Sequence, residues 1–441
     1  MTAWTYDAEM LATPVPRYTS YPTAAEFSEA GGRGEMEAAL DGVAPDEPVS
    51  LYVHIPYCHE ICWYCGCNTG AANRTQRLAS YLAALEAEAE MVAGRLGGRG
   101  RVQRIAFGGG SPNAIAPEQF AGLLARLRRA FGADDAMLSI ELDPRSLSDP
   151  WFDAVAAAGI ERASLGVQTL EPEVQRAIGR LQPFSLIEVC VEELRRAGVR
   201  SLNFDLMYGL PHQGLEELER TLRGAVALEP ERIALFGYAH VPHLIARQRQ
   251  IDGKALPDAE LRFRQAELGH KLLVAAGYEP VGFDHYALLS DPLALAAENS
   301  RLKRNFQGFT DDPAEVLLGL GASAISQFPQ LIVQNEKNAG RYNLRVSAGQ
   351  LPAERGVIRG EDDRRRGQAI EQLLCNGKAN VAGLVDVQLL ERLRPFLDRG
   401  LATLEAGRLR LPDYGRPYAR VIAALFDRYR QPAAQRFSSA I

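Results

Sequence analysis

The sequence predicts an α/β fold: a partial, three-quarter barrel of about six β–α units, with an arm before it and a small, mostly helical domain after it. Two observations lead to this prediction. Apolar runs of strand length alternate with segments of helical spacing from about residue 49 to residue 276, and the alternation is lost after about residue 310. Such alternation is typical of parallel β–α–β units, and eight units are needed to close a full barrel.

The strands of this barrel are expected where short apolar runs are bounded by polar or glycine residues. They cover residues 49–55, 102–107, 137–142, 162–167, 201–207 and 232–238. The helices have apolar positions at intervals of three and four residues. They cover residues 78–96, 117–131, 149–158, 185–197, 215–228 and 259–276. The arrangement is similar to part of a TIM barrel, in which functional side chains gather at the carboxyl ends of the strands.

Three regions are predicted along the chain. Residues 1–35 form an irregular, proline-punctuated arm, which is either a strap over the core or a lid over a site. Residues 36–350 form the barrel domain, and its segment 317–323 is a strand or a close-packed turn. Residues 351–441 form the C-terminal domain. Its elements are helices at 364–375 and 387–399, a hairpin at 403–411 and a helix at 417–429. That order resembles a winged helix, a module that contacts DNA or serves only for packing.

The charge balance argues against two classes of partner. The 441 residues include 49 Lys and Arg and 55 Asp and Glu, which gives a net charge of −6. A mildly acidic chain is a poor general binder of nucleic acid or of anionic membranes, so an anionic ligand needs a local concentration of positive charge. We see no secretory signal and no apolar stretch of about 18 residues, and therefore expect a cytoplasmic protein. No sustained heptad pattern is present, and we expect a monomer.

Four of the six cysteines fall within ten residues, directly after the first predicted strand. Cys58, Cys62, Cys65 and Cys67 have the spacing C-x3-C-x2-C-x-C. In a reducing compartment, clustered thiols indicate metal or redox chemistry rather than disulfides. Thiolates are the usual ligands of iron–sulfur clusters, and C-x3-C-x2-C supplies three of the four that a [4Fe-4S] cluster takes. One iron is then open to a substrate or cofactor.

Two alternatives to this open cluster remain. A structural zinc site would use all four cysteines, although zinc ligands more often come as two separated pairs. Cys67 could instead be a fourth cluster ligand, which would complete an all-cysteine cluster used only for electron transfer.

The cysteine loop and several other motifs resemble one family. C-x3-C-x2-C after a first strand resembles the radical S-adenosylmethionine (radical SAM) superfamily. More closely, the chain resembles the oxygen-independent coproporphyrinogen III oxidase family. The motifs that carry the closer resemblance are 16–23 (PRYTSYPT), 65–68 (CGCN), 108–112 (GGGSP), 140–145 (IELDPR), 166–168 (GVQ), 205–211 (DLMYGLP), 238–240 (YAH), 284–285 (DH) and 305–308 (NFQG). Ser111-Pro112-Asn113 departs from the more usual Thr-Pro-Thr but keeps the hydroxyl, and Trp63 fills an aromatic position.

The resemblance implies the activity: oxidative decarboxylation of two propionates of coproporphyrinogen III to vinyl groups, which gives protoporphyrinogen IX for haem synthesis. It implies that Cys58, Cys62 and Cys65 bind a [4Fe-4S] cluster whose open iron binds SAM, and that Cys67 lies near the site without being a ligand. For a first SAM it implies Tyr52, Gly109, Glu141 and Ile325. For a second SAM it implies Tyr64, Gly110, Ser111, Gln168, Arg180, Asp205 and Ala239.

The substrate and the partners follow from the same resemblance. The tetrapyrrole carries four propionates, which an acidic protein must meet with local cations. Our candidates near the substrate are Arg17, His285, Arg304, Phe306 and Gln307. A flavodoxin or a ferredoxin is the expected electron donor. Two alternatives stay open: a related radical SAM enzyme that binds or modifies haem, and an iron–sulfur protein without catalysis.

Overall fold

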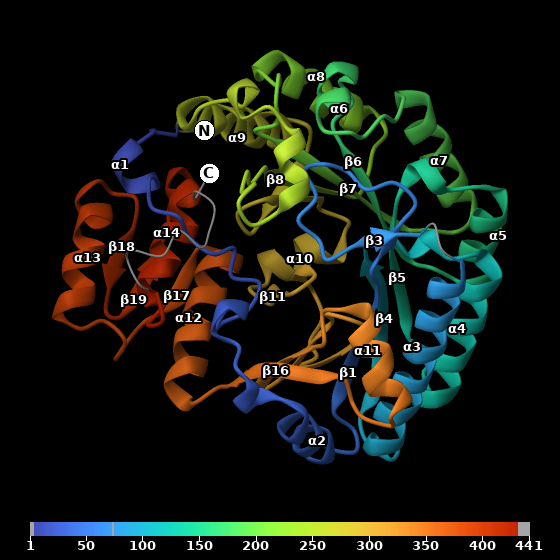
Figure 1. Ribbon diagram of the computed structural model, residues 1–441. Helices are drawn as coiled ribbons and strands as arrows, with labels where there is room; N and C mark the ends of the chain where they lie inside the picture. Colours follow the sequence, from blue (N-terminus) through green and yellow to red (C-terminus); the bar gives the residue numbers. More distant parts are fainter. Residues whose placement is uncertain (1–3, 73–74, 431–441) are drawn as a thin grey trace.

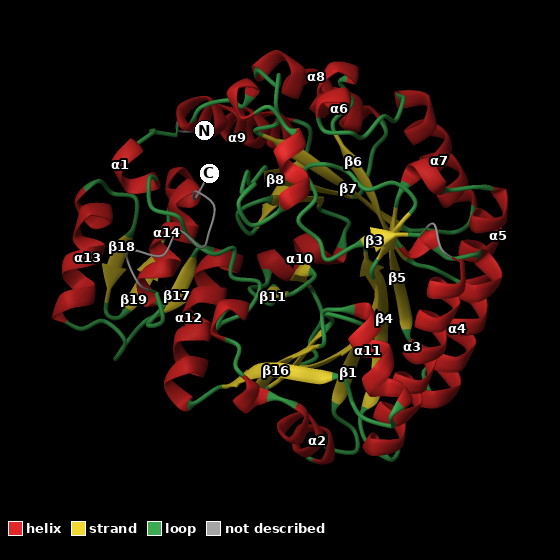
Figure 2. Cartoon of the chain, in the orientation of Figure 1, coloured by secondary structure: helices red, strands yellow, loops and turns green. Residues whose placement is uncertain are grey.

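A twelve-stranded sheet forms the wall of the predicted partial barrel (Figures 1 and 2). The computed structural model describes residues 4–72 and 75–430, so the ends of the predicted arm and C-terminal domain, 1–3 and 431–441, lie outside it. All six predicted barrel strands are present and are parallel neighbours. They are β1 (Pro48–Ile55), β4 (Arg101–Gly109), β5 (Met137–Leu142), β6 (Arg162–Gln168), β7 (Ser201–Tyr208) and β8 (Arg232–Gly237).

Short strands extend the sheet at both edges. The predicted segment 317–323 contains β13 (Val316–Leu320), which runs parallel to β1 and is buried throughout. Beyond β13 the sheet continues antiparallel through β14 (Ile325–Phe328), β15 (Leu331–Asn335) and β16 (Ala353–Ile358). The other edge is built from β10 (His285–Leu288) and β9 (Tyr278–Val281). Since β16 and β9 end the sheet, the described strands form an open barrel, as predicted.

Helices cover the outside of this sheet, as Figure 2 shows. The six predicted helices are α3 (Thr75–Leu96), α4 (Pro117–Phe131), α5 (Asp149–Ala158), α7 (Phe184–Arg196), α8 (Leu215–Ala227) and α9 (Ala259–Ala275). Helix α4 buries Phe120, Leu123, Leu124 and Leu127, one face at helical spacing, and ends where Gly132 adopts a left-handed conformation. Four shorter helices complete the barrel domain: α2 (Arg33–Asp41), α6 (Pro172–Ala177), α10 (Pro292–Glu298) and α11 (Ala339–Ser347).

The arm is a strap between the barrel and the C-terminal domain. It contains one short helix, α1 (Ala8–Leu11). The Trp4 ring stacks on His270 of α9 at 5.0 Å between ring centroids. Farther along, the buried Tyr18 donates its hydroxyl to Asp427 at 3.0 Å. Aromatic residues of the arm share a buried cluster with α9 and the C-terminal domain, so burial of apolar surface holds the three parts together.

The C-terminal domain contains the predicted helices and hairpin, with one correction. Its elements are α12 (Glu361–Asn376), β17 (Lys378–Asn380), α13 (Val387–Asp398), β18 (Thr403–Glu405), β19 (Arg408–Arg410) and α14 (Ala419–Ala423). The continuous helix predicted over 417–429 is wrong: only α14 is α-helical, between 3-10 turns at 413–418 and 424–426. Asp427 is extended and uses its carboxylate for Tyr18 and for the backbone of Tyr429, which ends the helical run.

The remaining short strands form two hairpin-sized sheets near the barrel. They are β2 (Tyr57–Cys58) with β3 (Gly70–Ala71), and β11 (Lys303–Asn305) with β12 (Gly308–Thr310). A search of the described helices finds none with the length and apolar character of a membrane span.

Candidate active site

The cysteine loop leaves the carboxyl end of β1 and returns through β3. Its two ends are tied by backbone hydrogen bonds, from Gly70 N–H to Pro56 O and from Ala72 N–H to Cys58 O, both 2.9 Å. Within the loop, Cys62 is buried, Cys58 and Cys65 are partly buried, and Cys67 is exposed. The Cys67 N–H donates to Cys65 Sγ at 3.4 Å. Residue 62 is therefore the most buried of the four cysteines and residue 67 the most exposed, and Cys67 lies directly beside Cys65.

Two arginines converge on the sulfur of Cys62. Arg145 Nη2 and Arg180 Nη1 each donate to Cys62 Sγ at 3.3 Å. Asp143 holds both guanidinium groups, at 2.7 Å from Arg145 and 3.1 Å from Arg180. Burial alone would raise the pKa of the Asp143 carboxyl, but the hydrogen bond from Arg145 and the charges of both arginines lower it.

The resemblance implied Arg180 as part of the site, whereas Asp143 and Arg145 were not named as site residues. Both belong to the motif 140–145 on which the resemblance rests, so that motif held the signal. Nothing in the local spacing indicates that they contact a cysteine more than 80 positions earlier.

The donor set fits an iron–sulfur cluster. Three thiols project from one short loop, and positively charged donors at Cys62 favour the thiolate that a cluster iron binds. Among residues 4–72 and 75–430, no three His, Cys, Asp or Glu side chains form a group that could hold a single metal ion. In a cluster each thiolate binds a different iron, so its ligands stand farther apart than those of a mononuclear zinc site.

The glycine loop after β4 brings backbone directly against Glu141. Gly109 N–H donates to Glu141 Oε2 at 3.2 Å. A Cβ on Gly108 would lie 2.7 Å from the Glu141 carboxyl carbon, and one on Gly110 would lie 2.5 Å from Tyr57 O. Gly109 has φ +117, which only glycine adopts readily. Side chains at these positions would thus separate β4, the cysteine loop and the Glu141 carboxylate.

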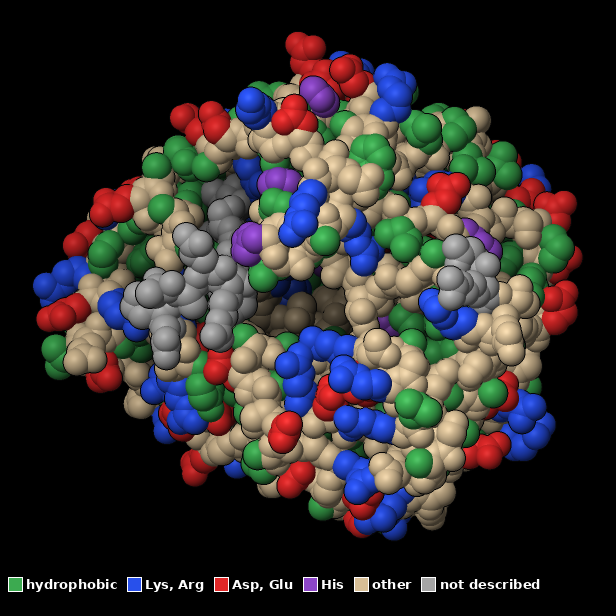
Figure 3. Space-filling view, viewed as in Figure 1, with side chains coloured by type: hydrophobic (Ala, Val, Ile, Leu, Met, Phe, Trp, Pro, Cys, Tyr) green, Lys and Arg blue, Asp and Glu red, His purple; other side chains and the backbone are tan. Residues whose placement is uncertain are grey.

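One cavity lies inside the barrel and extends from the amino-terminal ends of β5 to β8 up to Glu141 and Asp205. Its volume is about 350 Å³, and its lining includes Tyr52, Glu141, Asp205, His285 and Gln307, together with the arginines Arg104, Arg162 and Arg232. The space-filling view shows a hollow near the centre of this face, with Lys and Arg side chains along its lower rim (Figure 3). Predicted SAM residues and predicted substrate residues therefore share this cavity.

The cavity shifts the ionisation of the groups that line it. Burial, reinforced by the charge of Asp205, raises the pKa of Glu141 to about 7, and the Gly109 N–H only partly offsets this. Burial also raises the pKa of Asp205, against hydrogen bonds from Ser164 and Asn203. Burial raises the pKa of Tyr52, and the charges of Glu141 and Cys67 add to the effect.

Two of the residues predicted for a second SAM, Gln168 and Arg180, lie together beside β6, because a Cβ on Gly166 would be 2.9 Å from Arg180 Nη2 and 3.3 Å from Gln168 Nε2. Gln168 has φ +59 at the end of β6 and donates to Asp205 O at 3.4 Å. Gln168 Oε1 and Arg180 Nε are buried atoms that have no hydrogen-bond partner among the described residues. Buried polar atoms are almost always paired in proteins, so these two fit a site that a polar ligand completes.

The backbones of Tyr64 and Ala239 are joined by a residue that the sequence analysis missed. Gln248 Nε2 donates to Tyr64 O at 2.9 Å and to Ala239 O at 3.0 Å. Ser111 is fixed to the same loop, because its N–H donates to Tyr57 O at 2.8 Å. Nothing in the spacing of Gln248 predicts this link.

The remaining predicted residues divide into those beside the cavity and those away from it. His285 lines it and is held by Asp284 at 2.7 Å. Arg17 lines a different pocket, described below. Arg304 is buried with its guanidinium over the rings of Phe283 and Phe309, and its Nε donates to Tyr18 O. Three further predicted residues do not line the cavity: Arg304, the partly buried Phe306, and Ile325 at the start of β14.

The fold and the cysteine loop define a radical SAM enzyme. Residues 52–225 match the family model of the radical SAM superfamily. The chain is 41% identical to the oxygen-independent coproporphyrinogen III oxidase of Bradyrhizobium diazoefficiens, over 97% of both chains. It is 37% identical to that of Escherichia coli, over 97% of this chain and 96% of the relative. It therefore belongs to the oxygen-independent coproporphyrinogen III oxidase family.

Comparison with solved structures agrees with this assignment. The structure of coproporphyrinogen III oxidase from Escherichia coli, a radical SAM enzyme, has a TM-score of 0.90 and 34% sequence identity to this chain. The match covers 97% of this chain and 100% of the other. The cofactors are accordingly a [4Fe-4S] cluster and SAM, as predicted.

Proposed function

We propose that this protein converts coproporphyrinogen III to protoporphyrinogen IX by oxygen-independent oxidative decarboxylation of two propionate side chains to vinyl groups. The observation that carries the proposal is that the glycine loop after β4 contacts both the cysteine loop and a carboxylate of the barrel cavity: Ser111 N–H donates to Tyr57 O, and Gly109 N–H donates to Glu141 Oε2. The chain also matches named oxidases over nearly their whole length. Each propionate loses one hydrogen atom from its β-carbon, one CO2 and one electron, which passes to an acceptor.

The cofactors would be held by residues of three sets. Cys58, Cys62 and Cys65 would bind the cluster. Tyr52, Gly109, Glu141 and Ile325 would bind a first SAM, and Tyr64, Gly110, Ser111, Gln168, Arg180, Asp205 and Ala239 a second. When bound, the cluster and SAM supply a 5′-deoxyadenosyl radical, which abstracts the hydrogen atom.

The chain's own residues position these groups and set local charge. The Asp143–Arg145–Arg180 network holds two cations against Cys62. At a pH above its pKa of about 7, Glu141 is ionised, and its carboxylate would bind the ammonium group of the first SAM. Gly109 N–H holds that carboxylate in place. Preorganised donors and charges of this kind orient a ligand without further rearrangement.

Cys67 would serve the site without binding the cluster. It is exposed at the edge of the loop, and its backbone N–H donates to the sulfur of Cys65. Hydrogen bonds to cluster sulfurs are one of the means by which a protein adjusts a cluster's potential. The cysteine side chain at this position borders the Tyr52 rim.

Further properties belong to the proposal. A low-potential carrier, a flavodoxin or a ferredoxin, would reduce the cluster. The protein would act in the cytoplasm as a monomer that binds neither nucleic acid nor membrane, in keeping with its net charge of −6.

An anaerobic assay tests the proposed function. Cluster-reconstituted protein is incubated with SAM, dithionite and coproporphyrinogen III, and 5′-deoxyadenosine and porphyrin mass are measured together. We expect loss of two CO2 per tetrapyrrole with matching 5′-deoxyadenosine. Formation of 5′-deoxyadenosine without decarboxylation would support the radical chemistry but show that coproporphyrinogen III is not the substrate. Absence of both products with cluster-loaded protein would contradict the catalytic role. Cys62→Ser, which removes a cluster ligand, is the negative control.

A further inference from the structure

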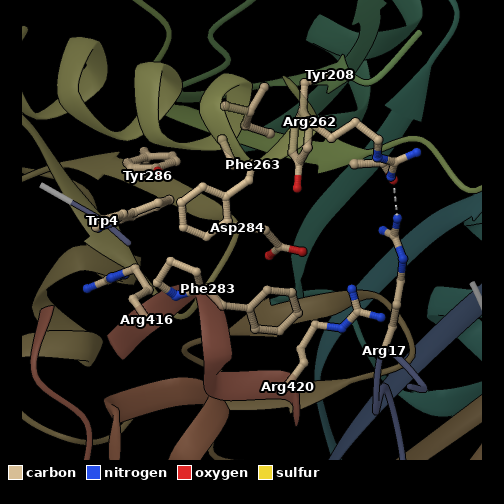
Figure 4. Close-up of a pocket in the computed structure, with 14 residues that line it drawn as sticks. Trp4, Arg17, Tyr208, Arg262, Phe263, Phe283, Asp284, Tyr286, Arg416 and Arg420 are labelled. Carbon is tan, nitrogen blue, oxygen red and sulfur yellow. Dashed lines mark hydrogen bonds between the residues drawn. The ribbon is translucent and has the colours of Figure 1, made fainter. Parts of the chain in front are cut away.

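A second pocket, beside the barrel mouth, concentrates positive charge. It lies between the arm, α9, the ends of β7 and β8 and the C-terminal domain (Figure 4). Four arginines line it, Arg17, Arg262, Arg416 and Arg420, against one carboxylate, Asp284. In Figure 4 the guanidinium groups of Arg17 and Arg420 and the carboxylate of Asp284 face the space that the Tyr208 hydroxyl also faces.

The carboxylate that lines this pocket, Asp284, already has a hydrogen-bond partner. Asp284 is hydrogen-bonded to His285 Nδ1 at 2.7 Å. Arg416 has its own partner, Asp413, at 3.5 Å. Within the described residues, no carboxylate lies within salt-bridge distance of Arg17 or Arg262, and the Nε of Arg262 is buried without a hydrogen-bond partner. Arg17 and Arg262 therefore bring positive charge to the pocket without an ion-pair partner among the described residues.

The arginines oppose one another's charge. Burial, with the charge of Arg17 added, lowers the pKa of Arg420 to about 9. Burial and Arg17 also lower the pKa of Arg262, while the tyrosines nearby act in the opposite direction. Buried cations are costly unless an anion is paired with them, so an anionic ligand would relieve this arrangement.

The size and position of the pocket narrow the class of anion. Its volume of about 60 Å³ has room for a carboxylate and a few waters but not for a tetrapyrrole ring. It adjoins the larger cavity through two side-chain contacts: the Arg17 guanidinium of the pocket lies 5.5 Å from the ring centroid of Phe236, which lines the cavity, and Asp284 of the pocket is hydrogen-bonded to His285 of the cavity. For a ring in the barrel cavity, Arg17 and Asp284 are therefore the nearest groups of the pocket.

We propose that this arginine pocket binds the carboxylate of a substrate propionate that is not decarboxylated. The proposal rests on the proposed function for the identity of the substrate. The reacting propionate lies at the cysteine loop and Glu141 rim, and a second propionate of the same ring is anchored by Arg17, Arg262 and Arg420. Arginine suits this role because its planar guanidinium binds a carboxylate through two parallel hydrogen bonds.

Arg262 gives the cleanest test. Arg420 and Arg17 also hold the backbone, through Val15 O and Gly237 O, so their loss would disturb the fold. Arg262→Gln removes the charge, keeps much of the side-chain length and breaks no side-chain hydrogen bond between described residues. Arg264→Gln is the matched control, because Arg264 lies two residues away on α9, is exposed and pairs with Glu260 and Glu267.

The first measurement is the affinity for coproporphyrin III, the stable oxidised form that carries the same four propionates, followed by fluorescence titration. We expect Arg262→Gln to weaken binding at least tenfold and Arg264→Gln to leave it unchanged. The tetramethyl ester, which lacks the carboxylates, should bind wild type and Arg262→Gln equally. Equal affinity of wild type and Arg262→Gln for coproporphyrin III would overturn the proposal.

Kinetics and stability separate this role from a structural one. In the assay with coproporphyrinogen III, Arg262→Gln should raise KM about tenfold with a small change in kcat. Its unfolding temperature should equal or exceed that of wild type, because a poorly paired buried cation is removed. A lower unfolding temperature with unchanged KM would assign Arg262 a structural role. If wild type binds coproporphyrin III through Arg262 but does not decarboxylate the substrate, the proposed function fails and the pocket stands.

Discussion

Arg180 donates a hydrogen bond to the sulfur of Cys62 across 3.3 Å, although the two residues are 118 positions apart. Arg145 donates to the same sulfur, and both arginines are held by Asp143. The side chains of Asp143, Arg145 and Arg180 are about nine-tenths buried. This network connects the cysteine loop to the ends of β5 and β6, and its balance of charge depends on one carboxylate.

The first prediction concerns that carboxylate. Asp143→Asn should lower the free energy of unfolding of the cluster-free protein by about 3 kcal/mol, because two buried guanidinium groups lose their common counter-ion. Glu60→Gln is the control: Glu60 also binds Arg145, at 2.9 Å, but its side chain is 73% exposed, so the loss should stay below about 1 kcal/mol. Urea unfolding at pH 7 measures both. Equal losses in the two variants would contradict a special role for Asp143.

The second prediction separates the four cysteines. Cys62→Ser should lose the cluster, whereas Cys67→Ser should retain it, because Cys62 is buried among the charged donors of the site and Cys67 is exposed at the edge of the loop. Iron content per chain and the charge-transfer absorbance after reconstitution report the outcome. Cys375→Ser is the control, since that residue is buried in a separate apolar cluster with Val281 and Leu302. Loss of iron from Cys67→Ser would favour an all-cysteine cluster.

Much of the fold follows from local pattern. Buried parallel strands are continuous apolar runs, and 49–55 or 201–207 stand out from the polar helices and turns round them. The edge strands β9, β10 and β14–β16 are only four to six residues long, and β9–β10 and β14–β15 pair as short antiparallel hairpins. Runs this short do not stand out from loops in the sequence. The segment 417–429 has helical spacing in the sequence, which led to the wrong prediction of a helix. In the structure, Asp427 is extended and accepts a hydrogen bond from Tyr18 of the arm.

Part of the candidate site could likewise be predicted from the sequence, and part of it could not. The cysteines share one loop, and Glu141 and Asp205 lie on parallel barrel strands, so β–α order predicted that these groups would face one barrel interior. The contact of Arg145 with Cys62 and the link made by Gln248 depend on how separate loops pack. The arginine pocket draws its lining from the arm, α9 and the C-terminal domain, so only the tertiary structure brings it together.

The third prediction is a pH dependence centred on Glu88 of α3. Glu88 accepts hydrogen bonds from Tyr342, Asn335 and the Gly321 N–H, but burial outweighs them and raises its pKa from 4.5 to about 7. A carboxyl with a raised folded-state pKa favours the folded state below its unfolded pKa. That contribution is lost as the pH rises from about 4.5 through 7, and amounts to roughly 3 kcal/mol.

Comparison of variants isolates this contribution. The free energy of unfolding of wild type should fall relative to that of Glu88→Gln between pH 4.5 and 7.5, while Glu90→Gln, an exposed position on the same helix, should follow wild type. Urea unfolding at three pH values is sufficient. A wild-type to Glu88→Gln difference that does not change with pH would show that Glu88 titrates normally.

The fourth prediction concerns Glu141 and SAM. At pH 8, above its pKa of about 7, Glu141 is ionised and should bind the SAM ammonium group. Glu141→Gln should weaken SAM binding about tenfold or more, the usual effect of losing one charge-assisted hydrogen bond. Wild-type affinity should also fall between pH 8 and pH 6, as Glu141 takes up a proton, whereas Glu141→Gln should show no such fall from this group. Anaerobic calorimetry on cluster-loaded protein measures both, with iron content as the control. Unchanged affinity at equal iron content would remove Glu141 from the SAM site.

The last prediction compares two glycines that differ in what surrounds them. A Cβ on Gly110 would lie 2.5 Å from Tyr57 O and 2.7 Å from Tyr57 N, and both are backbone atoms at the start of the cysteine loop. They cannot give way without breaking the hydrogen bonds from Gly110 N–H to Ile55 O and from Ser111 N–H to Tyr57 O. Gly110→Ala should therefore destabilise the cluster-free protein by more than about 1 kcal/mol and reduce iron incorporation.

Gly122 of α4 is the matched position, because a Cβ there meets no atom within 4 Å. Gly122→Ala should stabilise the protein by about 0.5–1 kcal/mol, since alanine loses less backbone entropy in a helix, and should leave iron content unchanged. Urea unfolding and iron analysis of the two variants give opposite signs if β4 and the cysteine loop depend on close backbone contact. A stable Gly110→Ala protein with full iron content would show that the loop tolerates separation from β4, and that this contact does not position the cluster.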